Sequence, residues 1–96
     1  MVRDGDLVAV FNSIHRVMKA EKLLKERRLE ILLIPAPRVL SSDCGLAIRY
    51  AEAIRHDVES ALAEAGLLPE ECHQKRGEEF VRIGLDDRRP PPASDG

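Results

Sequence analysis

The apolar residues of this chain change their spacing several times, and this alternation limits the folds that it can adopt. Leu7 to Phe11 is a short continuous apolar run, which is typical of a strand buried on both faces. From Ile14 onward the apolar residues recur with helical spacing, after two good N-cap residues, Asn12 and Ser13. The expected helix runs to about Arg28. Its core-facing stripe is predicted to comprise Ile14, Val17, Met18, Ala20 and Leu24.

The same alternation of strand and helix patterns continues along the rest of the chain. Residues 30–34 predict a second strand, which two prolines end, and the alternating residues 45–50 predict a third. Residues 52–65 predict a second helix that ends at Gly66. Its expected apolar stripe comprises Ile54, Val58, Ala61, Leu62 and Ala65. Residues 71–76, with a continuation to 83, predict a fourth strand or a strand with a hairpin.

The order of these elements, βαββαβ, predicts an α+β fold. We expect a ferredoxin-like sandwich, in which a four-stranded antiparallel sheet of spatial order 4-1-3-2 carries two helices on one face. This domain is expected to span residues 1–84. Residues 85–96, rich in proline and charge, are expected to form a disordered tail. In this topology the start of the third strand lies beside the end of the first.

Charge and composition exclude several classes of function. The net charge is −2, so no strong field favours nucleic acid or an anionic membrane. Only Phe11, Tyr50 and Phe80 are aromatic, which argues against base stacking. The chain has neither an apolar run long enough to span a membrane nor an apolar signal core at its start. We therefore expect a cytoplasmic protein whose thiols are reduced.

The chain contains two cysteines, Cys44 and Cys72. Two cysteines are too few for a disulfide scaffold, and these lack the CxxC pairing of zinc knuckles and redox motifs. The histidines His15, His56 and His73 show no metal-ligand spacing with either cysteine. We therefore expect no metal and no cofactor.

Cys44 is the stronger candidate for chemistry, because it opens the third strand beside the start of the first helix. The partial positive charge of a helix N-terminus should lower the pKa of a nearby thiol. Arg38 would add to this effect, and Asp43 would oppose it. By position parity Cys44 shares a side with Leu46 and Ile48, which favours burial instead. The residues alone leave open both a reactive thiol and a small buried side chain.

Further polar residues are expected around this thiol. Hydroxyl groups would donate hydrogen bonds, an arginine would bind an oxyanion, and a glycine would leave the backbone open to an approaching ligand. The candidate binding residues are Asn12, Ser13, Arg38, Ser41, Ser42 and Gly45. Weaker interpretations make His15 a proton-transfer group and Cys72 a resolving thiol, against ordinary exposure and packing.

Three segments carry a resemblance to a known family. They are Phe11-Asn12-Ser13 leading into 19–24, the proline-rich stretch 33–38, and Ser41 to Arg49, which contains the Cys-Gly pair. With these segments the chain resembles the selenium/sulfur carrier-like proteins from about Leu7 to Leu68, a range that stops short of Cys72. The resemblance implies a carrier rather than a turnover enzyme. Cys44 would bear the chalcogen as a persulfide or selenopersulfide and exchange it with donor and acceptor proteins.

A second interpretation makes the chain an ACT-like ligand-binding or regulatory module, since such modules share the βαββαβ plan. It would bind a small metabolite between two subunits and involve no thiol chemistry. The carrier interpretation predicts a monomer or a weak homodimer with a reactive Cys44.

Overall fold

A computed structural model describes residues 2–40 and 44–84 of the chain. The first half contains strand β1 (Leu7–Val10), helix α1 (Ile14–Glu26) and strand β2 (Ile31–Pro35). The second half contains β3 (Leu46–Tyr50), a short 3-10 turn (Glu52–Ile54), α2 (Arg55–Glu64), β4 (Glu71–Arg76) and β5 (Glu79–Ile83). The predicted tail at 85–96 lies outside the described residues. Among the described helices, none has the length and apolar content needed to cross a membrane.

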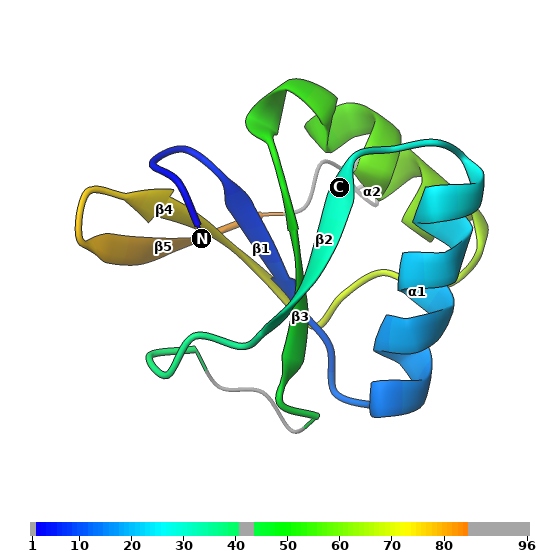
Figure 1. The fold of residues 1–96 in the computed structure, drawn as a ribbon, viewed down its shortest axis with the longest axis horizontal. Coiled ribbons are helices and arrows are strands. Elements are labelled where there is room, and N and C mark those ends of the chain that lie inside the picture. The colour runs from blue at the N-terminus through cyan, green and yellow to red at the C-terminus, as the bar shows by residue number, and fades with distance from the viewer. Residues whose placement is uncertain (1, 41–43, 85–96) are drawn as a thin grey trace, which may run out of the picture.

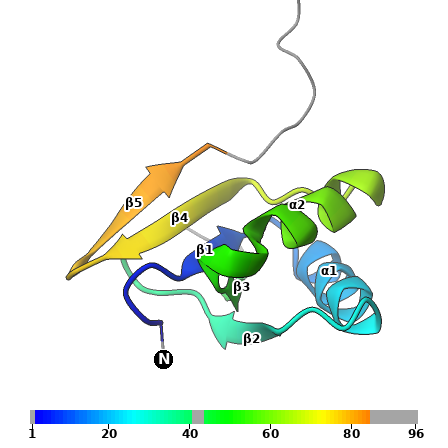
Figure 2. The same ribbon diagram turned by 90° about the horizontal axis from the view of Figure 1, so that it is seen from above.

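The strands form one antiparallel sheet in the order β2-β3-β1-β4-β5 (Figure 1). Central strand β1 pairs with β3 on one side and with β4 on the other, so that Leu7 faces both Tyr50 and Gln74. Helices α1 and α2 pack on the same face of the sheet, as the view from above shows (Figure 2). This pairing sets the start of β3 beside the end of β1.

The expected four-stranded ferredoxin-like βαββαβ sandwich is wrong, because the sheet has a fifth strand. Strand β5 pairs with β4 from Cys72↔Ile83 to Arg76↔Glu79, which leaves a two-residue turn at Gly77 and Glu78. Gly77 has φ +63°, a conformation that tight hairpin turns favour and that glycine adopts without strain. The hairpin gives β5 partners for its backbone and partial burial for its apolar side chains.

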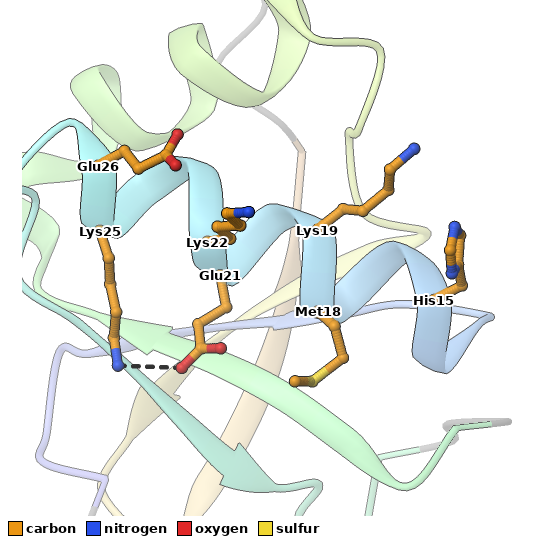
Figure 3. Close-up of a pocket in the computed structure, with 7 residues that line it drawn as sticks. All are labelled: His15, Met18, Lys19, Glu21, Lys22, Lys25 and Glu26. Carbon is orange, nitrogen blue, oxygen red and sulfur yellow. Dashed lines mark ion pairs between the residues drawn. The ribbon is translucent and has the colours of Figure 1, made fainter.

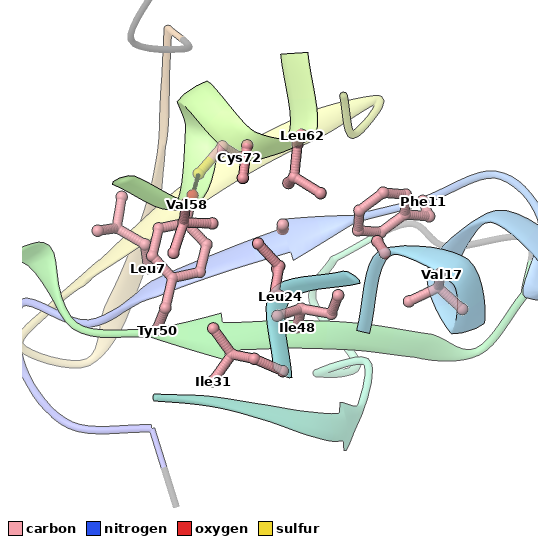
Figure 4. Packing of buried hydrophobic residues seen from close by; sticks show 13 residues of the cluster. Leu7, Phe11, Val17, Leu24, Ile31, Ile48, Tyr50, Val58, Leu62 and Cys72 are labelled. Carbon is pink, nitrogen blue, oxygen red and sulfur yellow. Dashed lines mark hydrogen bonds between the residues drawn. The ribbon is translucent and has the colours of Figure 1, made fainter. Parts of the chain in front are cut away.

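The larger core lies between the sheet and the two helices (Figure 4). Strands β1 and β3 contribute Leu7, Ile48 and Tyr50, and the residue after β1 contributes Phe11; all four are at most 1% exposed. Leu46 packs against the same cluster, so the predicted face of the third strand is confirmed. The helices contribute Val17, Ala20, Leu24, Val58, Ala61 and Leu62.

The apolar stripe of α1 is narrower than predicted. Val17, Ala20 and Leu24 are fully buried, but Ile14 is 58% exposed and Met18 is 45% exposed. The prediction that these two residues belong to the core is therefore wrong. Helical spacing identifies a face of about 100°, and only the centre of that face meets the sheet here.

A smaller apolar cluster covers part of the other face of the sheet. Its buried members are Val8, Val10, Ile34, Leu40 and Ala47. Because β1 contributes to both clusters, all four of its residues are buried. The prediction of a first strand buried on both faces is confirmed.

Candidate functional site

Cys44 lies immediately before β3, at the edge of the sheet where β1 ends and α1 begins. Its Sγ is 3.5 Å from the carbonyl oxygen of Phe11, the residue that follows β1. Two residues further on, Ser13 is the N-cap of α1. The starts of α1 and β3 both lie at the lower end of the molecule in Figure 1. The fold thus brings this thiol to the end of the sheet that holds the helix N-terminus.

The Cys44 side chain is half-buried and packs against the core beneath the helices. Its Sγ also lies 3.3 Å from the carbonyl oxygen of Leu46. Both carbonyl oxygens are acceptors, so these two contacts suit a protonated thiol that donates its S–H. Cys44 therefore shares a side with Leu46 and Ile48, as position parity predicts, while part of its surface stays open.

Gly45 shapes the backbone beside the thiol. Its φ is +74°, in the left-handed region where side chains are strained, and a Cβ placed on it would meet nothing within 4 Å. Its carbonyl oxygen accepts a hydrogen bond of 2.9 Å from the N–H of Ala36, which ties the segment after β2 to the thiol. Arg38 is exposed in this segment. Ser41 and Ser42 lie outside the described residues.

Ser13 and Asn12 make structural contacts in addition to lying near the thiol. Ser13 Oγ accepts hydrogen bonds from the N–H groups of His15 and Arg16, at 3.1 and 3.3 Å. Asn12 Nδ2 donates to a carboxylate oxygen of Glu70 at 2.9 Å, which links the start of α1 to the segment before β4. Of the two predicted N-cap candidates, Asn12 and Ser13, the N-cap of α1 is Ser13. The side chain of His15 is exposed.

Replacing Ser13 by alanine is expected to lower the free energy of unfolding by about 1 kcal/mol, because two N–H groups of α1 lose their acceptor. Urea unfolding of the purified variant measures this loss. Ser13→Asp is the matched control, since its carboxylate accepts the same hydrogen bonds and should restore most of the stability. Unchanged stability in Ser13→Ala would contradict a capping role.

Cys72 occupies a very different environment on β4. It is 1% exposed, and its Sγ lies 3.2 Å from the hydroxyl of Tyr50 (Figure 4) and 4.0 Å from a carboxylate oxygen of Glu59. Burial raises the pKa of the Cys72 thiol to about 11, although the Tyr50 hydrogen bond lowers it. The negative charge of Glu59 adds to the increase. At neutral pH this thiol is protonated.

Comparison with known families identifies the chain. The model of the family described as "Putative Se/S carrier protein-like" matches residues 6–74. The chain belongs to this family. A search of curated proteins gave no match, and a search of solved structures also gave none.

The family match covers both thiols of this Se/S carrier-like chain. It extends beyond Leu68, where the sequence resemblance was expected to end, and includes Cys72. Membership alone therefore does not distinguish the two cysteines, and the environment of each must do so. Cys44 is half-buried at a helix start, whereas Cys72 is enclosed in the core.

Sequence reasoning missed a buried polar cluster around Cys72. Glu59 on α2 is 1% exposed, and its carboxylate accepts hydrogen bonds from the Tyr50 hydroxyl at 3.0 Å and from Arg55 Nε at 3.2 Å. The signal that could have revealed it is helical spacing: Arg55, Glu59 and Leu62 lie on one face of α2. In this carrier-like chain the cluster belongs to the core, away from the surface.

Proposed function

We propose that this protein carries sulfur or selenium as a persulfide or selenopersulfide on Cys44. The observation that supports this choice is the contrast between the two thiols within the matched region. Cys44 is half-buried and lies beside the start of α1, whereas Cys72 is 1% exposed with a pKa raised to about 11 by burial. A thiol that receives an atom from another molecule must be reachable and must form a thiolate.

The loading reaction is an exchange between two sulfur atoms. The Cys44 thiolate attacks the terminal sulfur of a donor persulfide, R–S–SH, and forms a new S–S bond as the S–S bond of the donor breaks. The donor sulfur leaves with the electron pair and takes up the proton that Cys44 released. The products are Cys44–S–SH and R–SH, so no external oxidant or reductant is needed. A donor R–S–SeH gives Cys44–S–SeH in the same way.

The helix start favours the loaded form. The terminal chalcogen of a loaded Cys44 would be bonded to Sγ, which lies 3.5 Å from the carbonyl oxygen of Phe11 and 3.3 Å from that of Leu46. The first turn of α1 carries partial positive charge, and it begins three residues after Phe11. Gly45 leaves room there, because the space that a Cβ would occupy is open. The carrier function also requires donor and acceptor proteins that exchange the atom with Cys44.

Incubation with a low-molecular-weight persulfide donor is expected to add the mass of one sulfur atom to the intact protein. Cys44→Ser should abolish this adduct, and dithiothreitol should remove it. Cys72→Ala is the matched control, because it deletes the other thiol and should leave the adduct in place. Intact-protein mass spectrometry makes the measurement. Absence of an adduct, or an adduct that persists in Cys44→Ser, would refute the proposal.

A further inference from the structure

Helix α1 has large apolar side chains that are exposed to solvent. Among the described residues, the large hydrophobic side chains that are exposed are Ile14, Met18, Leu32 and Val39. Ile14 and Met18 are one turn apart on α1, so they form a continuous apolar strip on its outer face. The exposure of two neighbouring large apolar residues indicates an interaction surface rather than a core.

The N-terminal end of this strip is close in sequence to a residue that contacts the candidate thiol. Ile14 follows Phe11 by three residues, and the carbonyl oxygen of Phe11 is the group 3.5 Å from Cys44 Sγ. Val39, 76% exposed, belongs to the segment after β2, and a hydrogen bond from the Ala36 N–H to the carbonyl oxygen of Gly45 joins this segment to the residue after Cys44.

The outer face of α1 is also basic. An open hollow of about 670 Å³ on this face is lined by three lysines and two glutamates, together with a histidine and a methionine (Figure 3): His15, Met18, Lys19, Glu21, Lys22, Lys25 and Glu26. Lys25 pairs with Glu21 at 3.0 Å, whereas Lys19 and Lys22 form no ion pair with any described residue. Within α1, four Lys and Arg residues stand against two Glu, although the whole chain has net charge −2. The positive charge is thus concentrated on this helix.

We propose that the α1 face formed by Ile14, Met18, Lys19 and Lys22 docks an acidic partner protein that exchanges the chalcogen with Cys44. This inference rests on the proposed carrier function. Carboxylates of the partner meet Lys19 and Lys22, and an apolar side chain enters the hollow beside Met18. Binding there brings the reacting sulfur of the partner to the N-terminal end of α1, where Cys44 lies.

Two matched peptides test the charge preference of this surface. Each contains one leucine and a cysteine activated as a mixed disulfide with thionitrobenzoate; one carries glutamates and the other carries lysines. The Cys44 thiolate forms a disulfide with the peptide sulfur, and the thionitrobenzoate anion leaves with the electron pair. At low salt the acidic peptide is expected to react about tenfold faster than the basic one, and added salt should reduce this ratio. Stopped-flow absorbance measures both rates.

Substitutions on α1 test whether this helix causes the faster reaction of the acidic peptide. In the double variant Lys19→Glu/Lys22→Glu, the basic peptide should react faster than the acidic one. Arg27→Glu/Arg28→Glu is the matched control, since it changes the net charge equally just beyond the far end of α1. In this variant the acidic peptide should still react faster than the basic one. Met18→Ser should slow the acidic peptide, and it should leave unchanged the rate of a third, acidic peptide in which glycine replaces the leucine.

Three results would overturn the inference. They are equal rates for the two wild-type peptides, a preference that survives the reversal at Lys19 and Lys22, and a dimer in sedimentation experiments that this reversal dissociates. The last result would assign the face to a second copy of the chain. A neutral small disulfide separates the two proposals: if Cys44 fails to react even with this probe, the carrier function itself is refuted.

Discussion

At pH 7, Cys72 in the folded protein is expected to react with iodoacetamide at least about a hundredfold more slowly than a cysteine in an unstructured peptide. Only the thiolate is alkylated, and a pKa near 11 leaves about one thiolate in ten thousand molecules. An ordinary cysteine, with a pKa of about 8.5, has a few per cent. The enclosure of Cys72, 1% exposed, adds a further barrier to the reagent.

The pH dependence of the alkylation rate tests whether the raised pKa of Cys72 is the cause of its slow reaction. Because burial raises the pKa of Cys72, its thiolate fraction should rise about tenfold per pH unit and level off only near pH 11. The experiment uses Cys44→Ser, in which Cys72 is the remaining thiol, and quantifies alkylation by mass spectrometry. In denaturant the same variant should react at the peptide rate. Rapid alkylation of folded Cys44→Ser at pH 7 would show that Cys72 is accessible and would remove the basis for choosing between the two thiols.

The sequence was informative about the position of Cys44, because that position depends on strand adjacency. The apolar run at β1 and the alternating pattern at β3 identified two strands, and antiparallel pairing sets the start of one beside the end of the other. Residue type alone predicted an N-cap at Asn12 or Ser13, and the structure has it at Ser13. The contacts of the sulfur with Phe11 and Leu46 carbonyl oxygens depend on three-dimensional detail that no spacing in the sequence specifies.

Sequence reasoning left one feature of the fold open, the hairpin in residues 71–83, and assigned another wrongly, each for a physical reason. Strand β5 is an edge strand whose apolar residues are only partly buried, so its alternation is weak and its pairing depends on the turn at Gly77. Ile14 and Met18 have the spacing of core residues, but the sheet does not reach them. Periodicity reports which residues share a face; it does not report whether another element covers that face.

Glu59 was missed because a charged residue on a helix is ordinarily exposed. Its partners come from elements far apart in the sequence: Tyr50 lies on β3 and Cys72 on β4. Desolvation raises the pKa of Tyr50 far above its usual range, and the charges of Cys72 and Glu59 act in the same direction. The Tyr50 hydroxyl is therefore a neutral donor to the carboxylate. Arg55 holds the same carboxylate oxygen from α2 and also donates to the carbonyl oxygen of Gly84.

Glu59→Ala is expected to lower the free energy of unfolding by about 3–4 kcal/mol. The substitution removes a buried acceptor, leaves the Tyr50 hydroxyl and the Arg55 guanidinium without their shared partner, and opens a cavity in the core. Glu59→Gln keeps the shape and an acceptor oxygen but loses the charge, so a smaller loss of about 1–2 kcal/mol is expected. Urea unfolding followed by circular dichroism measures both values.

Glu64→Ala on the same helix supplies the matched control for this prediction. Glu64 also pairs with an arginine, Arg27 at 3.1 Å, but its side chain is 65% exposed, so its removal should change stability by less than about 1 kcal/mol. A large difference in stability loss between these two substitutions would follow from the burial of Glu59 and the exposure of Glu64. Equal losses in Glu59→Ala and Glu64→Ala would mean that the cluster around Cys72 is open to water. In that case the raised pKa of Cys72, and with it the physical distinction between the two thiols, would no longer hold.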